Sequence, residues 1–223
     1  MIVGSGLIGK AFHLHDRDDV VFFASGVSNS LETDSNQFQR EENLIRKVIA
    51  ENSEKLFVYF STCSIYDSSK NDSQYVLHKL NMEHIISTET SNYLIARVSN
   101  AVGKGGNLNL LMNYVNRAIE NEETIHIHRS AKRNLIDVED VKNIVLHLID
   151  SKKEKGIYNV AFLRNFSIEE IVESFELLKG KTAVKEFQDK GESYSIDVNE
   201  ISDCFSAEEK DYYVQKLIRK YYS

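Results

Sequence analysis

Tyr75 and Lys79 are the two residues whose types and spacing most clearly suggest chemistry. Four residues apart on a helix, they would share one face, with Cβ atoms about 5–6 Å apart. A free phenol has a pKa of about 10, and an ammonium held beside it favours the phenolate. Such a pair can pass a proton to or from a carbinol oxygen. The alternative is an ordinary exposed helix, on which a Tyr and a Lys at this spacing are common.

A glycine motif gives this pair its first context. The motif G-S-G-L-I-G spans Gly4–Gly9, follows the apolar run Ile2–Val3 and precedes a helix-like run. A G-x-G-x-x-G dinucleotide site requires this strand–loop–helix setting. Its glycines permit a tight turn, the approach of backbone amides to a pyrophosphate, and close packing of helix on strand. A plain glycine-rich turn is the alternative.

A group of hydroxyl side chains gives the second context. The apolar run Leu56–Phe60 has the length and composition of a buried strand. Ser61 and Thr62 follow it directly. They would lie at the strand ends where open α/β sheets bind ligands. The alternative is an ordinary Ser/Thr-rich turn after the strand.

In this order, the three features resemble the short-chain dehydrogenase/reductase superfamily. They are most similar to its extended branch, the NAD-dependent epimerase/dehydratase family of nucleotide-sugar enzymes. Four further segments continue the resemblance, which runs to about residue 200. These segments are Ala24–Ser28 (similar to the loop over the dinucleotide), Ala96–Gly103 (L-R-x-x-N-x-x-G), Arg133–Val141 (R-D-F-I-H-V-D-D-V) and Gly156–Val160 (G-x-Y-N-V).

The resemblance implies catalytic roles for three residues. Tyr75 would be the general acid/base on a sugar oxygen. Lys79 would lower the pKa of that phenol and hydrogen-bond the nicotinamide ribose. Thr62 would hydrogen-bond the reacting oxygen, or Ser61 would do so if the register slips by one residue.

The resemblance also implies a cofactor, NAD or NADP, and a nucleotide-sugar substrate. The residues implied to hold the cofactor are Gly4, Gly6, Leu7, Ile8, Gly9, Ala24, Ser25, Gly26, Ser61, Tyr75 and Lys79. The residues implied to meet the nucleotide diphosphate of the substrate are Asn100, Arg133 and Lys190. Arginine suits this role through its forked donors. The alternatives are that Arg133 pairs with Asp137 or Glu139, and that Asn100 caps a turn.

The chain departs from the family in its cofactor-binding half. Only ten residues separate Gly9 from the apolar run Val20–Ala24, which resembles the family's fourth strand. The second and third strands are therefore expected to be missing. The acidic residue that normally binds the adenosine ribose lies at the end of the second strand. We expect part of the adenine pocket to be absent, and the sequence does not assign NAD or NADP.

A second departure concerns the residues after Thr62. Sugar dehydratases of the family carry an Asp-Glu pair there, whereas this chain has Cys63 and Ser64. Neither replaces a carboxylate in acid and base work, so dehydration is not expected. Cys63 is expected to be a small packing residue.

Composition bounds the remaining classes of function. The 223 residues, with 42% hydrophobic and 27% charged residues, are typical of a globular protein. A net charge of −7 argues against nucleic acid as a partner. Two cysteines indicate a reducing compartment, and no apolar run approaches the roughly 18 residues of a membrane span. With no signal-peptide pattern, we expect a cytoplasmic protein that does not associate with membranes.

The histidines indicate no metal site. His126 and His128 alternate along an expected strand with no third ligand nearby. His78 is expected to point away from the Tyr–Lys face into solvent.

Strand and helix patterns alternate along the chain, which predicts a parallel sheet covered on both faces. The expected strands are Ile2–Val3, Val20–Ala24, Leu56–Phe60, Tyr93–Arg97, Thr124–His128 and Ile157–Val160. The expected helices are Leu7–His15, Phe38–Glu51, Tyr75–Thr88, Leu108–Glu120, Val138–Ser151 and Ser167–Leu178, with a further helical pattern over 207–223. The fold class is thus α/β, a shortened doubly wound, Rossmann-like sheet. Residues 1–160 would form the nucleotide-binding domain, with a substrate loop near 101–131, and residues 161–223 a small, mostly helical substrate-binding portion.

These patterns leave two functions open. The first is a nucleotide-sugar reductase or epimerase that transfers hydride at a sugar carbon, with Tyr75 as acid/base. The alternative is a degenerate family member that binds a nucleotide or a protein partner without catalysis. The missing strands favour the alternative, whereas retention of Thr62, Tyr75 and Lys79 favours the enzyme. Family members often dimerise through the Tyr-bearing helix, so a homodimer through Tyr75–Thr88 is also open.

Overall fold

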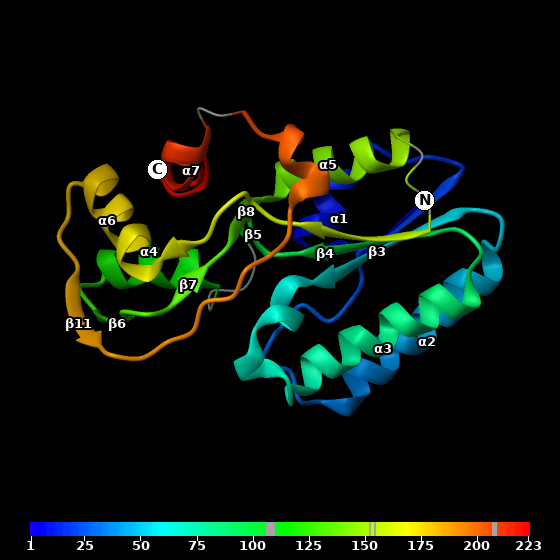
Figure 1. Ribbon diagram of the computed structural model, residues 1–223, viewed down its shortest axis with the longest axis horizontal. Coiled ribbons are helices and arrows are strands. Elements are labelled where there is room, and N and C mark those ends of the chain that lie inside the picture. The colour runs from blue at the N-terminus through cyan, green and yellow to red at the C-terminus, as the bar shows by residue number, and fades with distance from the viewer. Residues whose placement is uncertain (106–109, 152, 154, 207–208) are drawn as a thin grey trace.

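A computed structural model describes residues 1–105, 110–151, 153, 155–206 and 209–223 (Figure 1). The chain forms a mixed α/β fold around a five-stranded parallel sheet, in the strand order β1-β2-β3-β4-β9. The strands are β1 (Ile2–Val3), β2 (Val20–Phe23), β3 (Leu56–Thr62), β4 (Tyr93–Val98) and β9 (Gly156–Val160). Every residue of β2 and β3 is buried, as expected for strands covered on both faces.

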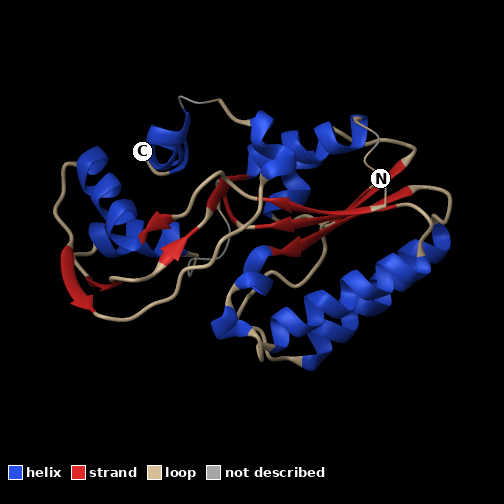
Figure 2. Cartoon of the chain, in the orientation of Figure 1, coloured by secondary structure: helices blue, strands red, loops and turns tan. Residues whose placement is uncertain are grey.

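Two helix layers cover the sheet (Figures 1 and 2). Helices α1 (Leu7–Phe12) and α5 (Val138–Asp150) lie on one face, and α2 (Ser35–Glu51) and α3 (Gln74–Glu89) on the other. Successive strand residues point to opposite faces. Phe22 accordingly packs in the core beneath α1 and α5, and Phe23 in the core beneath α2 and α3.

The short interval after Gly9 has the predicted consequence. Strand β1 pairs in parallel with β2, with Ile2 opposite Phe22 and Val3 opposite Phe23. Among the described residues, β1 is the edge strand of the sheet. The strands that would extend the sheet beyond β1 in a full doubly wound fold are not present in the described part of the chain.

A second group of elements lies beyond the carboxyl ends of the strands (Figure 1). Strands β6 and β11 pair in parallel, β7 pairs with β10 in antiparallel fashion, and β5 pairs with β8 in parallel. The bounds are β5 (Asn100–Val102), α4 (Leu111–Glu120), β6 (Thr124–His128), β7 (Lys132–Arg133), β8 (Leu135–Asp137), β10 (Phe166–Ser167), α6 (Ile168–Lys179), β11 (Val184–Gln188) and α7 (Glu209–Tyr221), with short 3₁₀ turns η1 (Cys63–Tyr66), η2 (Ser68–Lys70) and η3 (Asn199–Cys204).

Helix α7 is hydrogen-bonded to the N-terminal end of α5. The Tyr213 hydroxyl donates to Asp140 at 2.6 Å and accepts from the Asp137 backbone N–H at 2.8 Å. Tyr221 and Lys220 bind the two carboxylate oxygens of Asp137, at 2.6 and 2.8 Å. The tail therefore packs on the body of the protein.

The predicted helices and strands are confirmed, with shifts at their ends. Helix α1 ends at Phe12 instead of His15, and α2 begins three residues before Phe38. The predicted start of the Leu108–Glu120 helix lies outside the described residues, and α4 begins at Leu111. The pairing of β6 with β11 was not predicted, because Val184–Gln188 is largely exposed and carries no clear apolar pattern.

No helix in the described part of the chain is long and apolar enough to cross a membrane. Within the same residues, no cluster of three metal-binding side chains is present.

Candidate active site

The glycine motif forms a tight turn against the end of β2. Gly4 has a φ of +119°, and a Cβ there would lie 2.3 Å from the Ala24 carbonyl oxygen. A Cβ at Gly9 would lie 2.5 Å from the carbonyl oxygen of Gly4. Both positions therefore require glycine. Gly6 is different, because it is exposed and a Cβ there would meet no atom within 4 Å.

The segment after β2 connects this turn to the predicted catalytic lysine. The Ala24 N–H donates to the Val3 carbonyl at 2.7 Å, so Ala24 continues the pairing of β2 with β1. Two residues later, a Cβ at Gly26 would lie 2.7 Å from the Nζ of Lys79. Gly4 and Gly9 thus contact the end of β2, and the segment from Ala24 through Ser25 to Gly26 leads from there to Lys79. Leu7 and Ile8 lie at the start of α1, and Leu7 packs against Gly103.

Thr62 and Tyr75 meet where β3 ends and α3 begins. Thr62 is the last residue of β3, and its hydroxyl accepts from the Ser64 N–H at 3.0 Å. Tyr75 is the second residue of α3 and is buried. Burial raises the pKa of Tyr75 to about 12, the neighbouring Thr62 hydroxyl opposes this rise, and the Glu41 charge adds to it.

Ser61, the alternative to Thr62, is engaged elsewhere. Its hydroxyl donates to Glu83 at 2.5 Å, and Glu83 also receives the Arg97 guanidinium at 2.6 Å. Arg97 continues to the Tyr66 hydroxyl at 3.1 Å. Thr62 is thus the hydroxyl that lies beside Tyr75.

Lys79 is buried on the same side of α3, with an exposed fraction of 2%. Its ammonium donates to Glu41 at 3.1 Å and to the Tyr59 hydroxyl at 3.0 Å. It lies 5.9 Å from the centre of the Tyr75 ring. Burial lowers the pKa of Lys79, and the charge of Glu41 opposes this fall. The pKa of Tyr75 is therefore raised and not lowered as predicted, chiefly because the phenol is buried and also because the Glu41 carboxylate lies nearby.

Glu41, on α2, is fully buried and accepts from four donors. Besides Lys79, these are the Val27 N–H at 2.6 Å, the Tyr59 hydroxyl at 2.6 Å and the His78 ring at 3.1 Å. Burial alone would raise the pKa of Glu41, but the hydrogen bond of His78 and the charge of Lys79 outweigh it and lower the pKa to about 2. The expectation that His78 faces solvent was therefore wrong.

The sequence contained a signal for both buried carboxylates. Glu41 shares the buried face of α2 with Ile45, Val48 and Ile49, at spacings of four, seven and eight residues. Glu83 lies four residues after Lys79 and is also buried. A charged residue on the apolar face of a helix is rarely buried without a partner.

The three predicted substrate residues lie on the second group of elements. The Asn100 side chain, in β5, donates to the Asn134 carbonyl at 2.7 Å. Arg133, in β7, donates to the carbonyls of Lys132 and Glu192 at 2.8 and 3.2 Å. Lys190 is exposed, two residues from Glu192.

The alternative partners of Arg133 are otherwise occupied. Asp137 binds Lys220 at 2.8 Å, and Glu139 binds Lys142 at 2.5 Å. Burial lowers the pKa of Lys70, the charge of Asp67 opposes this fall, and the charge of Arg133 adds to it.

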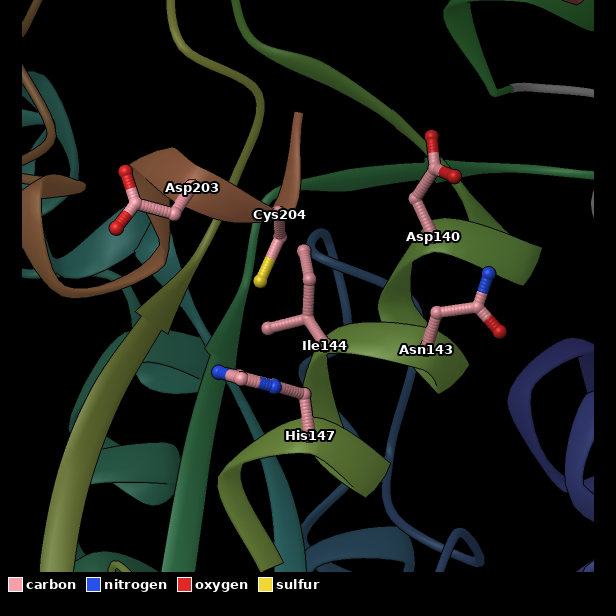
Figure 3. A pocket seen from close by; sticks show the side chains of 6 residues that line it. All are labelled: Asp140, Asn143, Ile144, His147, Asp203 and Cys204. Atoms are coloured by element: carbon pink, nitrogen blue, oxygen red, sulfur yellow. The ribbon is translucent and has the colours of Figure 1, made fainter. Parts of the chain in front are cut away.

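A cavity of about 260 Å³ lies elsewhere, between α5 and η3 (Figure 3). Its lining residues are Asp140, Asn143, Ile144, His147, Asp203 and Cys204. None of them belongs to the predicted site, and burial raises the pKa of the Cys204 thiol, which disfavours a reactive thiolate.

Several solved structures share this fold. MoeE5 in complex with UDP-glucuronic acid and NAD is 17% identical, with 90% of this chain and 79% of that chain covered and a TM-score of 0.72. UDP-glucuronic acid 4-epimerase from Bacillus cereus, in complex with UDP-glucuronic acid and NAD, is 17% identical, with 98% and 77% covered and a TM-score of 0.73. RMD from Pseudomonas aeruginosa, complexed with NADPH, is 16% identical, with 98% and 96% covered and a TM-score of 0.74.

No curated protein sequence matches the chain. The sequence model of one family does match, that of the NAD dependent epimerase/dehydratase family, over residues 4–161. This match covers more than half of the chain and includes the glycine turn, Thr62, Tyr75 and Lys79. The chain therefore belongs to the NAD dependent epimerase/dehydratase family.

Proposed function

We propose that the chain is a nicotinamide-dependent reductase or epimerase of a nucleotide sugar. The observation that carries the proposal is the placement of Tyr75 and Lys79 on one buried face of α3, with the Thr62 side chain near enough to Tyr75 to lower its pKa. The neighbours in fold support the substrate class, because two of those named above hold UDP-glucuronic acid.

The glycine turn fits the pyrophosphate of NAD or NADP. A phosphate group can approach the backbone at Gly6, because an added Cβ there would meet nothing within 4 Å. Gly4 and Gly9 fix the conformation of the turn. The cofactor would lie along Gly4–Gly9, Ala24–Gly26, Ser61, Tyr75 and Lys79. When bound, its nicotinamide accepts or supplies the hydride at the reacting sugar carbon.

The chain's own residues would handle the proton and the substrate. Thr62 would hold the reacting sugar oxygen, and Tyr75 would give it a proton or take one from it. Arg133, with Asn100 and Lys190, would meet the substrate diphosphate. We infer that Lys190 belongs to, and Asn100 and Arg133 adjoin, a substrate-binding portion built from residues near 101–131 and 161–223.

Dehydration is not part of the proposal. Burial raises the pKa of the Cys63 thiol to about 12, so it stays protonated. Its neighbour Ser64 carries no charge, and neither residue supplies the carboxylate that acid and base work at adjacent carbons requires.

The test is a panel of UDP- and other nucleotide sugars and their keto forms, incubated with each reduced or oxidised nicotinamide cofactor. Conversion of any panel member, lost in Tyr75→Phe, supports the enzyme. Cofactor-dependent thermal stabilisation without conversion would favour the second candidate, a nucleotide-binding member without catalysis. The edge position of β1, which removes the usual adenosine-binding strand, is the observation that favours this second candidate.

A further inference from the structure

Glu41 gives Lys79 an anchor from outside α3. The carboxylate comes from α2, 38 residues earlier in the chain, and is fully buried. It receives the ammonium of Lys79 at 3.1 Å and the hydroxyl of Tyr59 at 2.6 Å. Tyr59 receives the same ammonium at 3.0 Å, so the three groups form a closed ring of hydrogen bonds.

This ring of hydrogen bonds determines the electrostatic field at Tyr75. The charged or titratable groups in and around the ring of hydrogen bonds are Glu41 from α2, Tyr59 from β3, and His78, Lys79 and Glu83 from α3. The backbone N–H of Val27 completes the shell of Glu41. A buried carboxylate in contact with the ammonium cancels most of the positive field that would otherwise favour a phenolate.

We propose that Glu41 is a positioning residue that holds the Lys79 ammonium against Tyr59, so that Tyr75 stays protonated and the site works as a proton donor in the reduction of a keto sugar. The proposal rests on the proposed function above and selects reduction over epimerisation. The motivating geometry is the 5.9 Å between the Lys79 ammonium and the Tyr75 ring, with both lysine contacts directed elsewhere.

The chemistry of reduction suits a protonated phenol. In reduction, a bound nicotinamide in its reduced form would supply a hydride to the carbonyl carbon of the keto sugar and become oxidised, as the C=O π bond breaks. The carbonyl oxygen would take the phenolic proton of Tyr75, which leaves a hydroxyl group on the sugar and a phenolate on the protein. The phenolate then regains a proton from solvent. Epimerisation begins with the opposite step, removal of a hydroxyl proton, for which a phenolate must already be present.

The test reads the ionisation of Tyr75 directly and needs no substrate. The protein is labelled with ¹³C at the ζ carbon of tyrosine, and the Tyr75 signal is assigned by its loss in Tyr75→Phe. We expect Glu41→Gln to move the midpoint of Tyr75 ionisation down by about one pH unit or more, which is a tenfold larger phenolate fraction at a given pH. Glu42→Gln, the same change one residue later, where the carboxylate pairs with Arg46, is the matched control and should not move the midpoint.

An unchanged or raised midpoint in Glu41→Gln overturns the proposal. If that variant does not fold, Tyr59→Phe takes its place, because it removes one anchor of Lys79 and keeps the buried ring. A smaller downward shift is then expected, and no shift in this variant also overturns the proposal.

The titration of Tyr75 and the assay for nucleotide-sugar conversion can fail independently of each other. If no nucleotide sugar is converted, the proposed enzyme fails while the titration still judges the role of Glu41. If conversion is found, Glu41→Gln should raise the turnover number for alcohol oxidation relative to that for ketone reduction by about tenfold at fixed pH, both measured at saturating substrate and cofactor. An unchanged ratio, with the midpoint shifted, would show that Glu41 does not favour the reduction step.

Discussion

Gly26 lies directly against Lys79. A Cβ at Gly26 would stand 2.7 Å from the lysine Nζ and 2.7 Å from Oε1 of Glu41. The loop proposed to lie over the cofactor is therefore in contact with the charge pair behind the proposed acid/base. A displacement of the Gly26 loop therefore displaces the Lys79–Glu41 pair, and the reverse also holds, because Gly26, Lys79 and Glu41 are packed together.

The first prediction follows from this contact. Gly26→Ala should destabilise the protein by about 1–3 kcal/mol, the usual cost of overpacking a filled site. Gly6→Ala is the matched control, because its added methyl enters open space at an ordinary φ of −71°. Urea unfolding of both variants makes the comparison, and equal stability of the two would contradict the packing described here.

The second prediction concerns the phosphates. Gly6→Val places a branched side chain where backbone amides should approach a pyrophosphate, and should abolish NAD(H) and NADP(H) binding with little loss of stability. Calorimetric titration measures the affinity, and thermal unfolding measures the fold. Unchanged affinity for both cofactors would remove the glycine turn from the binding site.

The third prediction concerns the adenosine end. Because β1 is the edge strand of the sheet in the described residues, an adenosine would find less protein surface here than in a full doubly wound fold. Replacing NADH by reduced nicotinamide mononucleotide should therefore cost this protein less affinity than it costs a relative of full length. A crystal structure with the adenine enclosed in a pocket would show the prediction to be wrong.

The fourth prediction concerns turnover. Tyr75→Phe deletes the acid/base oxygen, and Lys79→Met deletes the charge that offsets Glu41. Each should lower turnover by about 10²–10⁴-fold, the usual contribution of general acid–base catalysis. The double variant should lose much less than the product of the two losses, because the groups act as one unit.

A matched background protects this measurement from a folding defect. Lys79→Met leaves the Glu41 carboxylate buried without its ammonium, which is strongly destabilising. The change is therefore also made in Glu41→Gln, where no buried charge remains to be compensated. Full turnover in Tyr75→Phe would exclude Tyr75 as the catalyst.

The fifth prediction concerns acid stability. The pKa of Glu41 is lowered from its usual range to about 2 in the folded protein. A lowered folded pKa contributes stability that is present above the unfolded pKa and is lost as pH falls toward the folded one. Between about pH 5 and pH 2 the free energy of unfolding should fall by about 3 kcal/mol through this group alone. Urea unfolding across this range should show a flatter profile in Glu41→Gln, and an equally steep profile would contradict the assignment.

Local patterns determined much of this protein. Apolar runs such as Leu56–Phe60 predict buried strands because both faces of a parallel strand are covered. The short interval between Gly9 and Val20 predicted the edge position of β1, since ten residues hold one short helix and no further strand pair. The spacing of Tyr75 and Lys79 placed both on one helix face, and both are buried there.

Only the tertiary structure decided what those side chains meet. Lys79 is held by residues 20 and 38 positions away, on β3 and α2, and which residues of two helices come into contact depends on how the helices pack on the sheet. The direction of the Tyr75 pKa follows from that packing, because burial and the opposing charge of Glu41 both come from other elements. The sequence by itself thus determined the elements and the chemical groups of the site. Packing between distant elements decided their partners and their charge state, because electrostatic interaction depends on distance in space and on burial.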